Sequence, residues 1–480
     1  MSSSQKTDEK PEQHHAHAVF IEGSLMRHVI TMSFTASIGL MAIFAVDLVD
    51  MIFISMLGNV ALAAAIGYAG TVLFFTSSIN IGLSIAAGAL VSQAIGRDEE
   101  AEARHFATSV ATYAVIIGLI VPTLVFLNLE HMLKFLGASG EALTLATSYL
   151  TILLPSMFLL GIAMTAMAVL RAHGDAKRSM YATLIGGIVN AVFDPIFIFA
   201  LDLGLEGAAM ASVLARVVML AVALMAALKH HNGFSKPHLG RTLKDTRTVM
   251  NLAAPAVLAN VATPVGSAFI VREMAKYGAD AVAGMAIIGR VTPVAFSVLF
   301  ALSGAIGPIL GQNFGAGLGE RVRDGFIAGL KFIVVYVLIV SLLLFLCRNL
   351  IIDLFDVTGV AQSLVLLFCG PLALMFIFNG FIFVGNAAFN NLGHPAYSAY
   401  INWGKNTLGT WPFVLAGGAL MGAQGVLIGQ AVGTFAFGIM AYVLARKIIG
   451  KPKHKDQATS RFHGFEIHRR LHAIYSSRHH

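Results

Sequence analysis

Long apolar runs make up most of this chain, and their length limits the possible folds more than any other feature. Most of these runs exceed the ~20 residues that an α-helix needs to cross a bilayer. They also lack the residue-by-residue alternation that is typical of membrane barrel strands. Of the 480 residues, 57% are hydrophobic and 12% are charged, whereas soluble domains carry about 25% charged residues. The sequence therefore predicts an all-α membrane protein that contacts the lipid bilayer over much of its surface.

The runs predict twelve transmembrane helices, arranged as two six-helix bundles that are related by a parallel internal repeat. Several runs are long enough for a helix to tilt or to extend beyond the bilayer. The expected spans are residues 28–56, 60–93, 103–127, 142–171, 178–201, 207–229, 246–275, 280–311, 321–347, 362–390, 396–419 and 424–446.

A charged stretch at residues 229–247 divides the chain into halves of similar length. The polar segments that precede the first run and follow the last run are expected to be disordered cytoplasmic tails. The predicted division is a tail at 1–24, an N-terminal lobe at 25–230, a cytoplasmic linker at 231–245, a C-terminal lobe at 246–447 and a tail at 448–480.

The two halves repeat short sequence blocks at a nearly constant offset. The block that begins at Gly88 matches the block that begins at Gly307, and the offset is 219 residues. Gln93 and Gln312 are equivalent at that offset, as are Gly96 and Gly315 and the pair Arg104 and Arg323. Because each half has an even number of spans, both halves enter the membrane from the same side. A substrate site is then expected between or within the two bundles, near the bilayer midplane.

The distribution of Lys and Arg predicts the orientation of the helices. Basic residues gather in every second loop, whereas the opposite loops hold only Lys134, Arg272, Lys276 and Arg348. The positive-inside rule therefore places both termini in the cytoplasm. Since this rule accounts for the net charge of +7, the basic balance does not indicate a nucleic-acid partner.

Acidic side chains occur inside the apolar runs of the first half. Asp47 and Asp50 lie three residues apart in the first span, and Asn190 and Asp194 lie four apart in the fifth. Each pair can share one face of a helix. A carboxylate inside a membrane helix costs ~3 kcal/mol on insertion scales, so it is usually retained for a wet cavity, an ion or a partner. Further polar residues in the spans of the first half are Asn80, Tyr149 and Ser212.

Such carboxylates are suited to coupling transport to a cation. A carboxylate can take and release a proton, or it can bind Na⁺ together with amide and hydroxyl oxygens. Either event changes its charge and so changes which helix packing is favoured. Pro195, directly after Asp194, weakens the local helical ladder, as in helices that line transporter cavities.

The charged residues in the spans of the second half are expected to have a structural role and not a coupling role. Arg272 and Glu273 adjoin each other near a helix end, where pairing and snorkelling explain them. Lys331 and Lys405 can reach the interface along their own side chains. A snorkelling role at a helix end is also the alternative for Asp194, although Asp194 lies about midway along its segment. The titratable coupling site is therefore expected in the first half.

These motifs resemble the multidrug and toxic compound extrusion (MATE) family over about residues 28–446. The resemblance rests on several blocks together rather than on any one of them. They are VDMIF at Asp50 followed by LG and ALAAA up to 65, SQAIGR at 92–97, RAHGD at 171–175 followed by NAVFD at 190–194, GQNFGAG at 311–317 and NNLGHP at 390–395.

The resemblance implies a secondary-active antiporter in a bacterial inner membrane that exports small organic, cationic and aromatic compounds in exchange for H⁺ or Na⁺. It implies no cofactor and a monomer. The second half resembles the DinF-like branch, in which the coupling site lies in the N-terminal lobe. The matching cation-coupling positions are Asp50, Tyr149, Asn190, Asp194 and Ser212, with Asp47 and Asn80 as secondary candidates.

One position departs from the family pattern. The family often has a proline early in the first span, but this chain has Thr35 there, opposite Pro255 of the seventh span. A mechanism that needs a proline-assisted bend in the first span is therefore not expected unless Gly39 supplies the bend. The alternative function is export or flipping of a lipid-linked or metabolite substrate.

An enzyme is not expected. The sequence GASG at 137–140 fits the motif of an intramembrane serine protease, but it lies in a loop where Ser139 is a better helix N-cap. No Walker A sequence occurs, so ATP is not the expected energy source. The C-terminal tail is His-rich but has no spacing that fixes a metal geometry, and no metal site is expected.

Overall fold

The structure is a computed structural model that describes residues 18–57 and 60–450. These residues form helices joined by short turns, and the described part contains no strand. The first half consists of α1 (Leu25–Ser55), α2 (Val60–Gly96), α3 (Glu100–Leu127), the short α4 (Leu129–Phe135), α5 (Gly140–Leu153), η2 (Leu154–Ser156), α6 (Met157–Ala172), α7 (Ala176–Pro195), η3 (Ile196–Ala200) and α8 (Gly204–His231). The second half consists of α9 (Leu239–Ala275), α10 (Ala279–Ala295), α11 (Ser297–Gly315), α12 (Gly319–Phe355), α13 (Gly359–Leu367), η4 (Phe368–Leu372), α14 (Phe376–Asn391), α15 (Ala396–Asn406) and α16 (Trp411–Ile449).

Within the described residues these helices make twelve crossings, six in each half, which confirms the predicted fold class. Ten segments are long and apolar enough to cross a membrane, and the bent pair α13–η4 and α14 adds an eleventh. The segment 396–449 has 54 residues, more than twice the ~20 residues that one crossing needs. It reverses at Gly422, where a φ of 62° and a ψ of −144° suit glycine. This segment therefore supplies two crossings, the eleventh and the twelfth.

Several spans are broken, mostly at proline. The fourth span changes from α5 to α6 through a 3₁₀ turn that contains Pro155. In the fifth span, α7 ends at Pro195 and continues as the π-helical turn η3, which agrees with the expected weakening. The eighth span, expected as one helix over 280–311, is divided into α10 and α11 at Phe296, three residues after Pro293.

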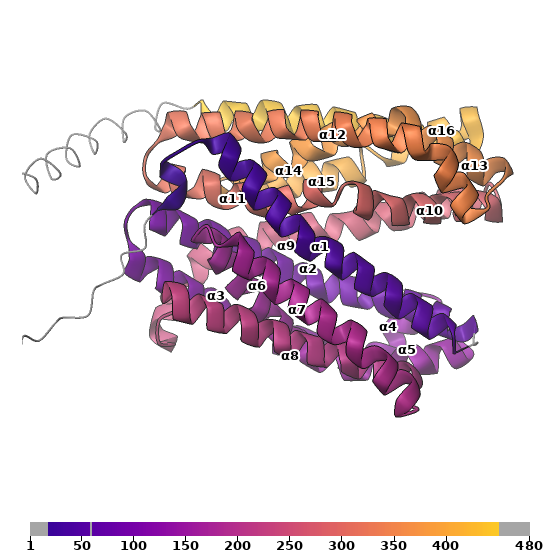
Figure 1. Cartoon of the computed structure of the whole chain (residues 1–480), viewed down its shortest axis with the longest axis horizontal. Helices are drawn as coiled ribbons and strands as arrows, with labels where there is room; N and C mark the ends of the chain where they lie inside the picture. The colour runs from indigo at the N-terminus through magenta and orange to yellow at the C-terminus, as the bar shows by residue number, and fades with distance from the viewer. Residues whose placement is uncertain (1–17, 58–59, 451–480) are drawn as a thin grey trace, which may run out of the picture.

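The first helix of each half packs on the opposite half. In Figure 1 the second half lies above the first, and α1 runs diagonally between them. α1 contacts α7 in its own half and α11 in the other, whereas α9 contacts α15 in its own half and α2 in the other. Since α1 corresponds to α9 and α2 to α11, the contacts follow the predicted repeat.

The two halves approach to backbone contact at the repeated blocks. A Cβ atom added at Gly96 would lie 2.1 Å from the Gln312 carbonyl oxygen, and one added at Gly315 would lie 2.1 Å from the Gln93 carbonyl oxygen. These four residues are the pairs that the sequence offset relates. Glycine allows α2 and α11 to pack with their backbones in contact. This contact joins the halves at the end of the bundle that carries residues 18 and 450, which we call the terminal face.

The segment just before α1 also joins the two halves at the terminal face. Phe20 is 1% exposed and lies in the 3₁₀ turn η1 (Val19–Ile21). Its backbone N–H donates to Gln312 Oε1 over 2.8 Å, and its carbonyl accepts from Asn313 Nδ2 over 3.0 Å. Gln312 Nε2 in turn donates to the Ala172 carbonyl over 2.7 Å. The expectation of a disordered tail up to residue 24 is therefore wrong for residues 18–24, because burial of Phe20 and these hydrogen bonds order the segment. The remaining tail residues 1–17 and 451–480 lie outside the described residues.

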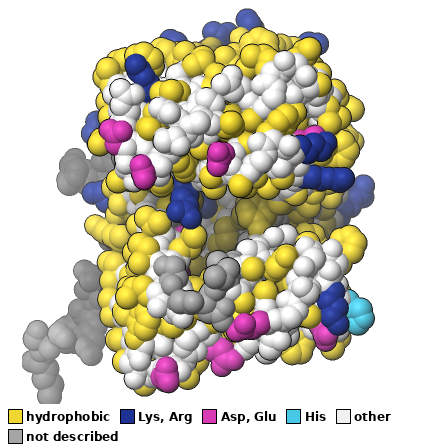
Figure 2. All heavy atoms as spheres, turned by 90° about the vertical axis from the view of Figure 1, so that its right-hand side faces the viewer, with side chains coloured by type: hydrophobic (Ala, Val, Ile, Leu, Met, Phe, Trp, Pro, Cys, Tyr) yellow, Lys and Arg dark blue, Asp and Glu magenta, His cyan; other side chains and the backbone are white. Residues whose placement is uncertain are grey.

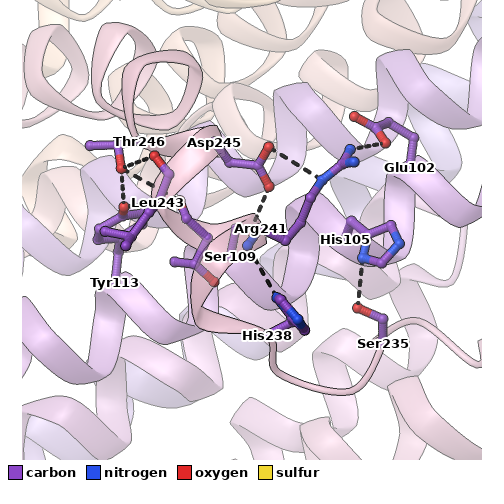
Figure 3. Close-up of polar contacts among 11 residues, drawn as sticks. Glu102, His105, Ser109, Tyr113, Ser235, His238, Arg241, Leu243, Asp245 and Thr246 are labelled. Carbon is purple, nitrogen blue, oxygen red and sulfur yellow. Dashed lines mark hydrogen bonds and ion pairs between the residues drawn. The ribbon is translucent and has the colours of Figure 1, made fainter.

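The connection between the halves is held by polar contacts to α3, shown in Figure 3. Arg241 forms an ion pair with Glu102, and Asp245 accepts a hydrogen bond from Ser109 Oγ over 2.6 Å. Tyr113 donates to the Thr242 carbonyl over 3.1 Å. α9 therefore begins at Leu239, inside the stretch 231–245 that is expected to be a linker, because these contacts hold its first turns against α3.

The face opposite the terminal face is hollowed between the two halves. Figure 2 shows this hollow from its open side, with hydrophobic side chains along its walls. The glycine contact between α2 and α11 lies at the other end of the bundle. The molecule is thus closed at the terminal face and open at the opposite face.

We predict that Gly96→Ala lowers the midpoint of thermal unfolding in detergent. The added methyl group overlaps the Gln312 backbone, and overpacking of this kind costs about 1–3 kcal/mol. The matched control is Gly67→Ala on the same helix, where a Cβ atom meets nothing within 4 Å. Equal midpoints for the two variants would show that the glycine contact does not limit the packing of the halves.

Candidate functional site

Three polar side chains from α1 and α7 meet inside the first half. Asn190 Nδ2 donates to Asp194 Oδ2 over 2.8 Å, and it lies 3.2 Å and 3.4 Å from the two carboxylate oxygens of Asp50. Asn190 and Asp194 share one face of α7 because they are four residues apart. Asp50 reaches them because α1 packs along α7. One amide therefore bridges two carboxylates from different helices.

Asp194 of this carboxylate pair is buried, Asp50 is half-buried, and neither has a basic partner among the described residues. Asp194 is 0% exposed and Asn190 is 6% exposed, and the Asn190 amide holds the two carboxylates close together. None of the ion pairs in the described part of the chain involves Asp47, Asp50 or Asp194, and Asp194 Oδ1 has no hydrogen-bond partner there. Two ionised carboxylates this close repel each other, and burial makes the repulsion stronger. A proton or a small cation at this position would relieve the repulsion.

Two other predicted site residues, Asp47 and Tyr149, differ in how far they are buried. Asp47 is exposed and lies three residues before Asp50 on α1. Tyr149 is half-buried and packs against the apolar cluster that contains Ile54 of α1 and Ile198 of η3.

The last two predicted site residues, Ser212 and Asn80, make no hydrogen bond to Asp50, Asn190 or Asp194. Ser212 is half-buried on α8, and its hydroxyl forms no hydrogen bond to a described residue. Asn80 is buried and donates to the Met157 carbonyl over 3.1 Å, where α6 begins. In this conformation Asn80 joins α2 to the break in the fourth span.

Arg216 is a half-buried arginine inside the sixth span that the sequence reasoning missed. Its Nη1 atom donates to the Leu153 carbonyl over 3.1 Å and to Ser156 Oγ over 2.6 Å. These acceptors lie at the break around Pro155, where the helical ladder is interrupted and a carbonyl is left to accept. The signal in the sequence was its position as the single charged residue of the apolar run 207–228.

Glu273 and Lys405 of the second half pair with residues of their own half. Glu273 pairs with Lys276 over 2.6 Å and not with its neighbour Arg272, because residues three apart share a helix face and adjacent residues do not. Lys405 donates to Asn379 Oδ1 over 2.9 Å. The interior carboxylate pair of the described chain therefore lies in the first half alone, which agrees with the expected asymmetry.

A cavity of about 270 Å³ lies between the halves, and we call it the inter-lobe cavity. Residues of α2 and α6 line it from the first half, and residues of α9, α11, α14 and α15 line it from the second. None of the first-half carboxylates lines it. In the described residues, no group of three or more His, Cys, Asp or Glu side chains is placed to hold a metal ion.

Comparisons with known proteins agree with this architecture. The MatE family model matches residues 35–196 and 255–412, which is more than half of the chain. A protein of Shewanella oneidensis named FAD transporter is 27% identical over 435 residues, which covers 88% of this chain and 94% of the relative. The multidrug export protein MepA of Staphylococcus aureus is 23% identical and covers 89% of this chain and 96% of its own length.

Solved structures show the same fold. The crystal structure of a mutant of the Vibrio cholerae MATE transporter VcmN matches with a TM-score of 0.84 at 23% identity, covering 90% of this chain and 98% of the other. An outward-facing structure of a multidrug resistance MATE family transporter matches with a TM-score of 0.83 at 22% identity, covering 91% and 99%. Members of this family are transporters and not enzymes. The match of the family model over both halves therefore assigns this multi-pass membrane protein to the MatE family of MATE transporters.

Proposed function

We propose that this chain is a secondary antiporter of a bacterial inner membrane that exports a small organic molecule in exchange for H⁺ or Na⁺. The observation that carries the proposal is the pair of the half-buried Asp50 and the buried Asp194, which Asn190 bridges and which has no basic partner in the described part of the chain. A buried carboxylate pair needs a compensating positive charge, and a proton or Na⁺ can supply it reversibly.

The position of the pair suggests how cation binding reaches the substrate pathway. The pair lies where α1 packs on α7, and α1 also packs on α11 and α12 of the other half. Loading the cation removes the repulsion between the two carboxylates and so favours a different packing of α1 on α7. Because α1 contacts both halves, that change alters the interface between them. This is a two-state element that ion binding biases.

The orientation is also part of the proposal. By the positive-inside rule the terminal face, with its Lys- and Arg-rich loops, is cytoplasmic. The hollow of Figure 2 then opens to the outside, and the molecule is in an outward-open state. One chain provides both halves of the cavity, so we propose that a monomer is the functional unit.

Two substrate classes fit the proposed exchange. Cationic aromatic compounds are expected from the MATE resemblance, and the staphylococcal relative is named as a multidrug exporter. Export of a metabolite is the second candidate, because the Shewanella relative is named as a FAD transporter and the acids do not line the inter-lobe cavity.

The decisive test is dye export from proteoliposomes under a pH gradient or a Na⁺ gradient, imposed separately. Rhodamine 6G and fluorescein share a xanthene ring and differ in charge. Rhodamine 6G represents the cationic aromatic compounds, and fluorescein represents an anionic metabolite. We expect one gradient to drive export of at least one dye and Asp194→Asn to abolish it, because the variant cannot hold the coupling cation. Glu273→Gln, which alters a buried acid of the other half, is the matched control and should retain export. Gradient-driven export that persists in Asp194→Asn would refute the proposed coupling site.

We further expect Asp50→Asn to impair coupled export by at least tenfold more than Asp47→Asn does. Asp50 contacts the Asn190 amide, whereas Asp47 is exposed and makes no hydrogen bond to a described residue. Initial rates of dye export at equal protein content measure the difference. The opposite order would move the cation site one turn along α1.

A further inference from the structure

We propose that the inter-lobe cavity binds an organic anion, with a carboxylate or phosphate group on Arg171 and a planar polar body against a set of asparagine amides. The inference rests on the proposed transport function and specifies its substrate class. It separates the site of the coupling cation, inside the first half, from the site of the substrate, between the halves.

The charge of the cavity wall is the first observation. Among the described residues that line the inter-lobe cavity, Arg171 is the only one with a charged side chain. It stands at the end of α6, opposite Gly304 of α11: a Cβ atom added at Gly304 would lie 3.9 Å from Arg171 Nε. An organic cation in this cavity would meet a positive charge and no carboxylate, whereas an anion would meet a matching charge.

Arg171 has no acidic partner in the described chain. Its Nη1 atom donates to Ser179 Oγ over 3.1 Å, and no carboxylate lies within ion-pair distance of its guanidinium. The nearby Arg178 differs, because it pairs with Asp175. A half-buried guanidinium without a counter-charge is unfavourable, and it presents planar donors that match a carboxylate or a phosphate. A ligand anion would compensate this charge when it enters.

Amide groups face the same cavity. Asn260 and Asn402 donate to carbonyl groups of their own helices over 2.8 Å each, which leaves their side-chain oxygens able to accept from a ligand. Asn386 Oδ1 is buried and has no hydrogen-bond partner among the described residues. An unsatisfied buried oxygen is costly and calls for a donor. A ligand that carries an N–H or O–H group besides its anionic group would satisfy this oxygen.

The cavity also offers an apolar surface for a ring. Phe383 lines the wall, together with Met164 and the small side chains of α2 and α9. A few polar groups within a mostly apolar wall are typical of sites for organic molecules. An aromatic or heteroaromatic acid with hydrogen-bond donors fits this combination of Arg171, amides and Phe383.

The test is equilibrium binding to the detergent-solubilised full chain, measured by fluorescence anisotropy with fluorescein and rhodamine 6G. The two dyes share their ring system and differ in charge. We expect fluorescein to bind at least tenfold more tightly than rhodamine 6G, and Arg171→Gln to weaken fluorescein binding at least tenfold. Arg171→Lys keeps the charge and should retain most of the affinity. Arg247→Gln, at an exposed position of α9, removes one positive charge elsewhere and should leave the affinity unchanged.

A second variant keeps the test informative if Arg171→Gln fails to fold. Asn386→Asp keeps the side-chain shape and adds a negative charge to the cavity wall, so it should weaken fluorescein binding and strengthen rhodamine 6G binding. The inference is overturned if rhodamine 6G binds as tightly as fluorescein, if fluorescein does not bind, or if a folded Arg171→Gln variant binds fluorescein like the wild type.

Failure of this inference and failure of the proposed antiport are distinguishable, since binding in detergent needs no gradient. Arg171-dependent fluorescein binding without gradient-driven export would support the anion site and refute the antiport. Asp194-dependent export of rhodamine 6G without fluorescein binding would do the reverse.

Discussion

The contact of α2 with α11 at Gly96 and Gly315 is the constraint on which the arrangement of the two halves depends. At this point each backbone occupies the space that a side chain would need on the other helix. The halves are held together at the terminal face and are separated by a hollow at the opposite face. An alternating-access cycle that opens the terminal face must break this contact. Hydrogen bonds from the Phe20 backbone to Gln312 and Asn313 would have to break as well.

Charged side chains are distributed unevenly between the first half and the wall that separates the two halves. The pair of Asp50 and Asp194 lies within the first half and is bridged by Asn190, whereas the wall between the halves carries Arg171 and amides. The proposed cation and the proposed anion thus have separate positions in the same molecule. In the proposed cycle they act on each other through helix packing, because the carboxylates do not line the inter-lobe cavity. Direct competition for one negative charge is not required for exchange.

Much of this architecture could be predicted from the sequence, because lipid imposes simple rules. The length of the apolar runs predicted the twelve crossings, and the offset of 219 residues predicted that Gln93 corresponds to Gln312 and Gly96 to Gly315. That these residues contact each other across the two halves was not predicted and is seen only in the structure. The spacing of Asn190 and Asp194 predicted their shared face. What local sequence could not predict depends on tertiary contacts: the order of residues 18–24 comes from side chains about 290 positions away. Arg216 was missed because its acceptors appear only when the fourth span breaks at Pro155.

The position of α1 between the halves shows how the two proposed sites could be coupled without a common ligand. α1 supplies Asp50 to the carboxylate pair, and it packs on α11, whose residues line the inter-lobe cavity. α1 has no proline opposite Pro255, and it runs as one continuous helix from Leu25 to Ser55. A continuous helix transmits a displacement along its length better than a helix with a hinge does. Coupling through α1 therefore favours a shift of the whole helix against α7 and α11 over a bend within it.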